Sequence, residues 1–392
     1  MEWFDSIYND LVSNGLVDVN ILYATAGFML LVFFIQLGYY LGTYGKIPRF
    51  RNNRGIRSNI PSEPVSVIVV IRENSYYYIE NYLPRLLTQE YAEFEVVAVD
   101  CSYDEEIERM LEEMAGLYPN LRITQIKAQQ GVEHGVKLAL TVGIKAAAYE
   151  NLIFTTVDSF PDSEKWLSLM AKGFIGGEVV IGYCGIEPKR GFVNGWMRCS
   201  RLMTSVRYLA AAIDNKPYRG ISHNLGYTKS LYFDNKGFNY LNMNTGDDDL
   251  FVQKISQNKS VSVVMNFRAT TRQIQYGGLG WWSSMCRSYS YAYRYYPFGV
   301  KLKTGMELWT RFLFFASVAA LLVLLPGVWK AVPGFFLLLR LAIVESGMYR
   351  ICRRLGEGKL IRHYVLYDLV SPFTELCLAI IRNLRPNKSI WR

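Results

Sequence analysis

The sequence lacks any spacing of cysteines that would suggest a metal site or a disulfide framework. Its six cysteines are scattered without a CxxC pair or a Cys/His cluster, at positions 101, 184, 199, 286, 352 and 377. Structural zinc sites need closely spaced ligands, and small secreted domains need dense cysteine pairs. The pattern argues against both and is typical of a reducing compartment.

Two nucleotide-binding signatures are also missing. No GxGxxG follows an expected strand, no GxxxxGK[ST] occurs, and the YGGLG at 276–280 follows no strand-to-helix turn. Such glycine-rich loops cradle phosphates in dinucleotide-binding and P-loop folds. Their absence argues against Rossmann dinucleotide binding and P-loop chemistry.

Long apolar runs, by contrast, are abundant, and 51% of the residues are hydrophobic. Residues 21–42 carry no charge and are long enough to cross a bilayer as a helix. Residues 1–20 contain no Lys or Arg, whereas residues 46–57 contain five. By the positive-inside rule, we expect segment 1–20, with the N-terminus, to lie outside and the chain after the helix to be cytoplasmic.

A second apolar region, 308–348, predicts a transmembrane helical hairpin with its turn on the outer side. Basic residues follow at 350–362, which agrees with the same orientation. Residues 363–385 carry Asp368 and Glu375 inside an apolar pattern, and we expect an amphipathic helix lying in the membrane interface.

The net charge of +9 can indicate nucleic acid or an anionic membrane surface. Because the basic residues cluster beside the apolar runs, they favour membrane lipids as partners and argue against nucleic acid. The prediction is an integral protein of the inner (cytoplasmic) membrane.

Residues 60–300 predict a cytoplasmic α/β domain. Strands are expected at 64–71, 94–100, 121–126 and 152–155, alternating with helices at 82–87, 104–114 and 137–148. This order predicts a mostly parallel sheet with helices on both faces. Later strands are expected at 179–183, 220–229 and 261–265, and later helices at 166–173, 194–212 and 281–296.

Carboxylates stand where such a sheet binds its ligands, at the carboxyl ends of strands. Asp100 ends one strand and is suited to accept hydrogen bonds from a nucleotide. Asp158 follows another, before a turn at Pro161, and is suited to hold a divalent cation (Mg²⁺ or Mn²⁺) on a diphosphate. The plainer interpretations are a strand-end cap at Asp100 and a turn at Asp158.

Three further acids, Asp247, Asp248 and Asp249, precede an apolar helix. Asp247 or Asp248 is suited to take a proton from an attacking hydroxyl, although a helix N-cap would explain the cluster as well. Lys137 and Arg287 are suited to steady the phosphates of a leaving group. On a helix, however, a lysine is usually a solvated residue, and Arg287 can instead contact lipid phosphates.

This combination resembles the membrane-anchored bacterial family-2 glycosyltransferases with the GT-A fold. The resemblance is carried by residues 64–100, by HGVKLALTVGIKAA (134–147), TTVDSFPDSEKW (155–166), HNLGYTKSLYFDNKGF (223–238) and TGDDDLF (245–251). It implies inverting transfer from a nucleotide sugar, expected to be a UDP-sugar, to a hydroxyl on a lipid-linked or glycan acceptor. The resemblance also allows the protein to take part in a membrane complex.

The resemblance also implies roles for individual residues. Asp248 would be the base, with Asp247 before it. The nucleotide-sugar side would comprise Arg72, Glu73, Asp100, Lys137, Asp158 and Arg287, with Asp158 on the metal. The acceptor side would comprise His223, Asn224 and Asp249.

The chain departs from the family pattern at several positions. The first Asp of D-x-D is Thr156, and the acid expected after Asp100 is Cys101. These changes leave open a weakened relative that only binds a nucleotide sugar and scaffolds polysaccharide assembly. A membrane nucleotidyltransferase is a third hypothesis. The absence of Q-x-x-R-W argues against a processive synthase.

Overall fold

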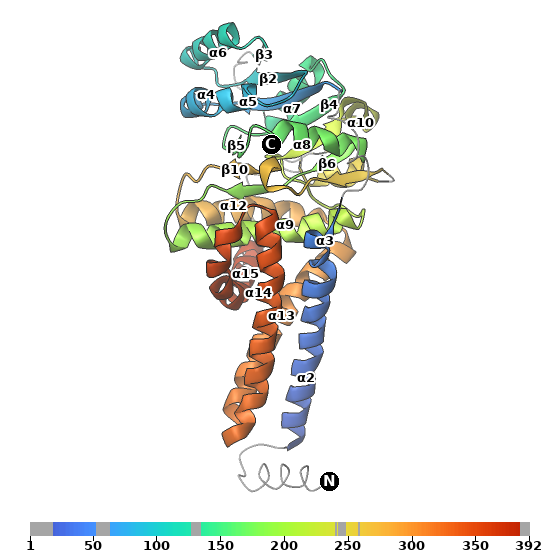
Figure 1. The fold of residues 1–392 in the computed structure, drawn as a ribbon, viewed down its shortest axis with the longest axis vertical. Coiled ribbons are helices and arrows are strands. Elements are labelled where there is room, and N and C mark those ends of the chain that lie inside the picture. Colours follow the sequence, from blue (N-terminus) through green and yellow to red (C-terminus); the bar gives the residue numbers. More distant parts are fainter. Residues whose placement is uncertain are drawn as a thin grey trace.

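The computed structural model describes residues 19–51, 63–126, 135–239, 241, 248–257 and 259–384. An α/β head sits on a stalk of long helices, with further helices packed where the two parts meet (Figure 1). The head contains the predicted sheet, and the stalk contains the predicted apolar segments.

The main sheet has the strand order β3-β2-β1-β4-β8-β6-β9. The four predicted strands of the first half are confirmed and pair in parallel: β1 (Val65–Ile71), β2 (Phe94–Asp100), β3 (Leu121–Gln125) and β4 (Asn151–Phe154). The later strands are β6 (Val179–Ile181), β8 (Leu225–Thr228) and β9 (Val261–Val263). Only β8 runs antiparallel to its neighbours, so the described sheet is mostly parallel.

Helices cover both faces of this sheet. Alternate residues of β1 therefore belong to two different hydrophobic clusters, one on each face. Ile68 and Val70 belong to the cluster that contains α7 (Val136–Ala146). Val67 and Val69 belong to the cluster on the opposite face. The other helices of the head are α4 (Tyr76–Asn81), α5 (Leu83–Leu87), α6 (Glu105–Leu117), α8 (Trp166–Ala171), α10 (Lys229–Asp234) and α11 (Leu250–Ile255).

A second sheet of three short strands was not predicted. It consists of β5 (Ser159–Pro161), β10 (Thr271–Gln273) and β7 (Cys184–Ile186), in that order. Where the sequence indicated a turn at Pro161, the chain instead forms the edge strand β5, a position in which proline is tolerated. The antiparallel pairing places Gln273 opposite Ser159, next to Asp158.

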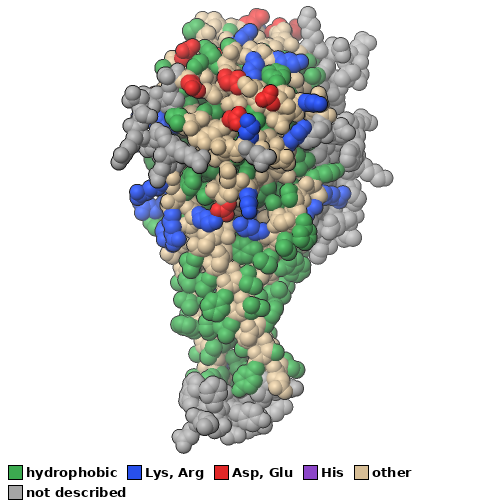
Figure 2. All heavy atoms as spheres, turned by 90° about the vertical axis from the view of Figure 1, so that its right-hand side faces the viewer, with side chains coloured by type: hydrophobic (Ala, Val, Ile, Leu, Met, Phe, Trp, Pro, Cys, Tyr) green, Lys and Arg blue, Asp and Glu red, His purple; other side chains and the backbone are tan. Residues whose placement is uncertain are grey.

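Among the described residues, three helical segments are long and apolar enough to cross a membrane: Asn20–Arg49, Phe298–Leu324 and Gly327–Arg354. The first comprises α2 (Val19–Leu37), the π-helical turn η1 (Gly38–Thr43) and α3 (Lys46–Arg49); the others contain α13 (Phe298–Leu324) and α14 (Ala331–Arg354). The stalk surface is apolar, and basic side chains gather where it meets the head (Figure 2). Both hairpin helices extend beyond the predicted range 308–348.

Between head and stalk lie α9 (Phe192–Ile213), α12 (Leu279–Ala292) and α15 (Ile361–Leu384) (Figure 1). Short 3₁₀ turns complete the chain: η2 (Lys172–Ile175), η3 (Phe267–Ala269), η4 (Tyr293–Tyr295), η5 (Gly327–Lys330) and η6 (Gly358–Leu360).

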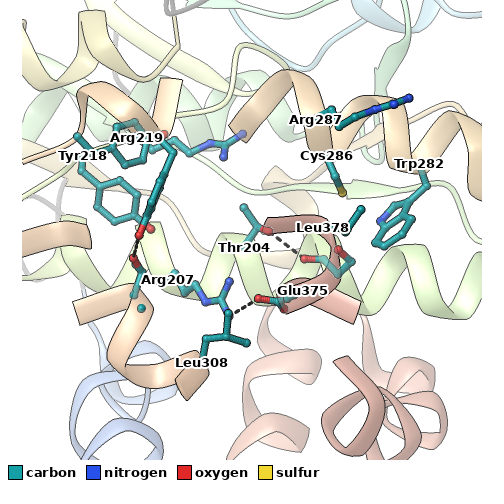
Figure 3. A pocket seen from close by; sticks show the side chains of 15 residues that line it. Thr204, Arg207, Tyr218, Arg219, Trp282, Cys286, Arg287, Leu308, Glu375 and Leu378 are labelled. Carbon is teal, nitrogen blue, oxygen red and sulfur yellow. Dashed lines mark hydrogen bonds and ion pairs between the residues drawn. The ribbon is translucent and has the colours of Figure 1, made fainter. Parts of the chain in front are cut away.

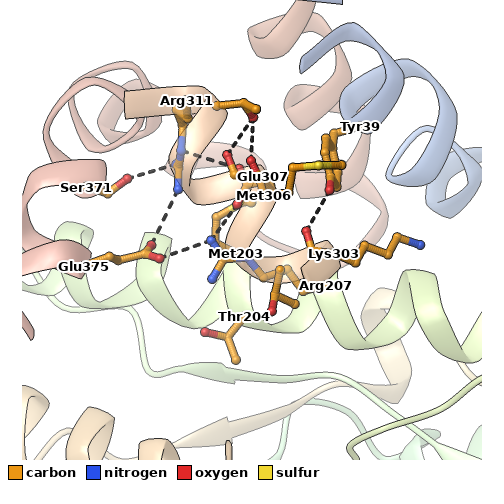
Figure 4. A network of polar contacts seen from close by, with 12 residues as sticks. Tyr39, Met203, Thr204, Arg207, Lys303, Met306, Glu307, Arg311, Ser371 and Glu375 are labelled. Atoms are coloured by element: carbon orange, nitrogen blue, oxygen red, sulfur yellow. Dashed lines mark hydrogen bonds and ion pairs between the residues drawn. The ribbon is translucent and has the colours of Figure 1, made fainter. Parts of the chain in front are cut away.

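A network of buried charges ties these helices together (Figure 4). Arg311 of α13 is fully buried, and its nitrogens lie 3.5 Å from Glu307 and 3.7 Å from both Asp368 and Glu375. Arg207 of α9 donates to Glu307 at 2.8 Å and to Glu375 at 3.2 Å. The two acids expected within an interfacial helix, Asp368 and Glu375, therefore turn toward the bundle, because buried guanidinium groups there need partners.

A second buried cluster joins the stalk to the head through Glu357, which is 1% exposed. Its carboxylate pairs with Arg198 of α9 and Arg272 of β10, and accepts a hydrogen bond from the Tyr183 hydroxyl at 3.1 Å. One carboxylate thus connects the end of α14 to the second sheet.

We expect Glu357→Gln to destabilise the protein by about 3–5 kcal/mol, because it removes the charged partner of Arg198 and leaves the buried Arg272 with Asp162 alone. Thermal unfolding of the full-length protein in detergent would measure this as a lower transition temperature. Glu112→Gln, on the exposed side of α6, is the matched control and should change stability by less than about 0.5 kcal/mol. Equal transition temperatures for both variants would contradict the role assigned to Glu357.

Candidate active site

The predicted site residues of the first half lie at one edge of the sheet. Arg72 directly follows β1, Asp100 ends β2, and Asp158 comes four residues after β4 ends. These three strands are neighbours and run parallel, with Ile71 opposite Asp100. Parallel strands end at a common edge, so these side chains share the face where open α/β sheets bind ligands.

Asp100 is oriented by the turn that follows its strand. Its Oδ1 accepts hydrogen bonds from the Ser102 backbone nitrogen at 2.9 Å and from the Ser102 hydroxyl at 2.7 Å. The neighbouring Arg72 and Glu73 side chains are exposed. The backbone nitrogen of Arg72 donates to the Ser75 hydroxyl at 3.2 Å. The edge therefore presents one fixed, buried carboxylate beside two exposed charged side chains.

Asp158 is surrounded by donors, although its side chain remains 31% exposed. Its Oδ1 accepts from the Thr156 hydroxyl at 2.5 Å, and its Oδ2 accepts from the Gln273 amide at 2.7 Å. The His223 Nε2 lies 3.3 Å from Oδ1. Burial raises the pKa of Asp158, but the charge and hydrogen bond of His223 and the bonds from Thr156 and Gln273 outweigh it and hold the pKa well below its usual value.

The Gln273 amide is itself held in one orientation. Its carbonyl oxygen accepts from Arg201, a buried residue of α9, which turns the amide nitrogen toward Asp158. The backbone of the next residue, Ile274, donates to the carbonyl of Asp158 at 2.6 Å. Neither Gln273 nor Arg201 was predicted as a site residue, because each is remote from Asp158 in the sequence and has no local motif.

One short segment, 219–224, connects the Asp158 site to the acidic cluster. The backbone nitrogen of Gly220 donates to the Asp248 carbonyl at 2.7 Å, and that of Ser222 lies 3.4 Å from the Asp248 carboxylate. The next residue, His223, contacts Asp158. The segment 219–224 therefore contacts both Asp158 and Asp248. His223, predicted on the acceptor side, lies beside the predicted metal carboxylate.

Asp249 is 2% exposed and begins α11. Its Oδ1 accepts from the Leu250 backbone nitrogen at 2.7 Å, and its Oδ2 accepts from the Tyr296 hydroxyl at 2.8 Å. Burial and the charge of Asp248 raise the pKa of Asp249 to about 6. Of the two candidate bases, Asp248 is half-buried, whereas Asp247 lies outside the described residues.

Asn224 is placed differently from its predicted acceptor-side role. It is fully buried, and its amide bonds to Trp166 at 3.0 Å and to the carbonyls of Tyr183 and Ala269 at 2.8 Å each. Its polar atoms therefore form hydrogen bonds inside the core.

Lys137, predicted to contact the donor phosphates, donates a hydrogen bond to the backbone carbonyl of Leu241.

Arg287 lies on α12 beside a cavity of about 280 Å³, which Arg207 and Arg219 also line (Figure 3). This cavity borders the acidic cluster, because Tyr296, the partner of Asp249, is also in its wall. The predicted phosphate contact thus belongs to a group of three arginines.

The donor set at Asp158 fits a cation that receives most of its ligands from elsewhere. Within the described residues there is no group of three or more His, Cys, Asp or Glu that could hold a metal ion. Asp158 and His223 provide one oxygen and one nitrogen ligand within 3.3 Å of each other. Magnesium and manganese commonly take one or two protein ligands and complete their shell with phosphate oxygens and water.

Residues 66–235 match the model of glycosyl transferase family 2. These residues form a family 2 glycosyltransferase domain. The match runs from β1 to α10 and includes Asp100, Asp158 and His223. The protein is a glycosyltransferase with the predicted GT-A fold.

Solved structures resemble the glycosyltransferase over most of its length. The mannosyltransferase PcManGT from Pyrobaculum calidifontis, in complex with GDP-Man and Mn²⁺, is 16% identical with a TM-score of 0.53, covering 90% of this chain and 99% of its own. TarS from S. aureus, in complex with UDP-GlcNAc, is 19% identical with a TM-score of 0.40, covering 79% and 89%. No curated protein sequence matches the chain.

The raised pKa of Asp249 predicts a pH-dependent stability. Below about pH 4 the carboxyl is protonated in both states, and as the pH rises through about 6 the folded state ionises later than the unfolded state. The folded state thus loses about 3 kcal/mol of stability across this range. Asp249→Asn keeps the helix cap but cannot ionise.

We therefore expect the melting temperature to fall less in Asp249→Asn than in the wild type when the pH rises from about 5 to about 7.5. Asp234→Asn, which changes an exposed acid on α10, should keep the wild-type dependence. Identical pH profiles of Asp249→Asn and the wild type would contradict the pKa assignment.

Proposed function

We propose that this glycosyltransferase moves a sugar from a nucleotide-sugar donor to a hydroxyl of a membrane-linked acceptor, with inversion at the anomeric carbon. The observation that carries the proposal is the segment 219–224, which contacts both the Asp158 site and Asp248. A sugar bound between the two sites would meet its leaving group on one side and its nucleophile on the other.

In this mechanism Asp248 accepts the proton of the acceptor hydroxyl while the oxygen attacks the anomeric carbon. A new carbon–oxygen bond forms as the bond to the donor phosphate breaks, and its electron pair leaves with the nucleoside diphosphate. Attack opposite to the leaving group inverts the centre in a single displacement. Asp249 is already engaged by Leu250 and Tyr296, which leaves Asp248, or Asp247 before it, for this task.

Asp158 would hold the divalent cation, and His223 would become a second ligand only after its Nε2 loses the proton that it shares with Asp158. The cation would neutralise charge developing on the departing diphosphate. The bonds from Thr156 and Gln273 serve to keep the Asp158 carboxylate ionised and fixed before the donor binds. Thr156 replaces the first acid of the family motif. In this arrangement its hydroxyl orients the Asp158 carboxylate. The manganese in the PcManGT complex supports a cation of this kind.

The acceptor side is proposed to face the membrane from the cytoplasm. The three apolar helical segments can anchor the enzyme, and basic side chains gather where the stalk meets the head (Figure 2). The positive-inside rule supports a head in the cytoplasm and an N-terminus outside, and we propose the inner membrane as the site.

Replacement of the base should slow turnover without preventing donor binding. We expect Asp248→Asn to lower kcat by a factor of about 10²–10⁴, measured as nucleoside diphosphate release in the presence of acceptor. Asp247→Asn is the matched variant, and Asp234→Asn controls for loss of an exposed charge. Full activity of Asp248→Asn with a slow Asp247→Asn would transfer the role to Asp247, and full activity of both would refute the mechanism.

Donor binding should depend on Asp158 and a divalent cation. We expect calorimetry with UDP- and GDP-sugars to show binding only with Mn²⁺ or Mg²⁺, and Asp158→Asn to weaken it about tenfold or more, because a charged ligand is lost. Binding that is unaffected by chelator and by the substitution would overturn the assignment. Binding by the wild type without transfer to any acceptor would instead favour the scaffold hypothesis.

A further inference from the structure

A buried arginine is connected to the Asp158 site through one side chain of the second sheet. Arg201 lies in the middle of α9 and is 4% exposed. Its guanidinium donates to the side-chain carbonyl of Gln273 and, from the same nitrogen, to the sulfur of Met285 at 3.0 Å. Three elements, α9, β10 and α12, therefore meet at one buried positive charge.

The Gln273 amide can take only one orientation between its two neighbours. A guanidinium has hydrogen-bond donors and no acceptor, so Arg201 selects the amide oxygen. The amide nitrogen is thereby turned to Asp158, to which it donates at 2.7 Å. Oxygen is the amide atom that binds divalent cations, and here it faces the arginine. Gln273 therefore holds the Asp158 carboxylate and is not itself placed as a metal ligand.

The backbone of Gln273 is fixed on both sides. β10 is the central strand of the second sheet, and Gln273 pairs with Ser159 of β5 and with Ile186 of β7. The next backbone nitrogen, that of Ile274, donates to the Asp158 carbonyl at 2.6 Å. Strand pairing thus sets where the amide stands relative to Asp158, and a rigid strand is a suitable base for a residue that orients another.

The order of guanidinium, amide and carboxylate is favourable at both ends. The amide oxygen carries partial negative charge toward Arg201, and its N–H groups carry partial positive charge toward Asp158. A direct guanidinium–carboxylate pair is frequently bidentate and would occupy both carboxylate oxygens. Through the amide, Asp158 instead receives one hydrogen bond, and its side chain remains 31% exposed. The carboxylate is thus oriented while part of it stays open to a ligand.

We propose that Arg201 is a positioning residue of the donor site, which acts on the Asp158 carboxylate through the Gln273 amide. Without the guanidinium the amide is free to turn its oxygen toward Asp158, and two acceptors then repel each other. The carboxylate loses the orientation in which it would meet a cation. This inference rests on the proposed function, in which Asp158 holds the divalent cation on the donor diphosphate.

The test is a double-mutant cycle on the full-length enzyme in detergent, measured by calorimetry. The probes are Mn²⁺ alone and Mn²⁺ with UDP or with GDP. Arg201→Met and Gln273→Met each remove the hydrogen bonds of one partner, and a third protein carries both substitutions. Arg201→Lys is the conservative variant, because it keeps the charge but replaces the planar fork with a single amine.

We expect each substitution by Met to weaken binding of the nucleoside diphosphate with Mn²⁺ about tenfold, because a hydrogen bond to a charged group is lost or misdirected. The double variant should bind as Gln273→Met does, because Arg201 has nothing to act through once the amide is gone. Arg201→Lys should keep part of the affinity. Should Arg201→Met fail to fold, Arg201→Lys takes its place in the cycle, and its smaller loss should likewise vanish beside Gln273→Met.

Arg198→Gln is the matched control, since Arg198 is a largely buried arginine one turn earlier on α9 whose partner is Glu357. It should lower the melting temperature and leave binding of the nucleoside diphosphate unchanged. Wild-type binding by Arg201→Met would overturn the proposal. A further loss of about tenfold when Arg201→Met is added to Gln273→Met would also do so, because the effects would then be independent. Equal losses of binding in Arg198→Gln and Arg201→Met would show that removing any buried charge from α9 suffices.

The two proposals can fail separately. Binding that depends on Asp158 but on neither Arg201 nor Gln273 would refute the positioning role and leave the proposed function standing. Coupled effects of Arg201 and Gln273 in an enzyme that transfers no sugar would refute the proposed function and leave the positioning role. A wild-type enzyme that binds neither Mn²⁺ nor either nucleotide would refute both.

Discussion

The structure depends on keeping one carboxylate, Asp158, ionised and oriented in the loop that follows the parallel strand β4. Thr156 comes from its own loop, Gln273 from the second sheet, and His223 from the segment before β8. Their combined hydrogen bonds and charge outweigh the cost of burial. The carboxylate is therefore ionised before a ligand binds, and the same segment that supplies His223 also contacts Asp248.

A second constraint comes from buried ion pairs between the head and the stalk. Glu357 joins the end of α14 to β10, and Arg311 joins α13 to α15. Such pairs tolerate little displacement, since separating either partner exposes an uncompensated charge to a low dielectric. They hold the stalk helices at a constant position relative to the sheet. The cavity lined by α9, α12 and α13 is thereby kept next to the acidic cluster.

The elements predicted correctly were those with a strong local signal. β1 and β2 are continuous runs of mostly β-branched or apolar residues. The apolar stalk segments are long enough to cross a bilayer as helices. The second sheet was missed because three-residue strands have too few positions to show a period. The helix at 363–385 was predicted, but the partners of its acids were not, because Arg207 and Arg311 lie far away in the sequence.

The sequence by itself determined the α/β alternation, the apolar segments and the position of Asp158 after a strand, because each depends on neighbouring residues. Tertiary structure decided which side chains surround that carboxylate. Gln273 reaches Asp158 only through the pairing of β10 with β5, and Asn224 enters the core while the adjacent His223 faces the site. Long-range strand pairing brings together residues whose separation along the chain carries no periodic signal, and only the folded chain determines these contacts.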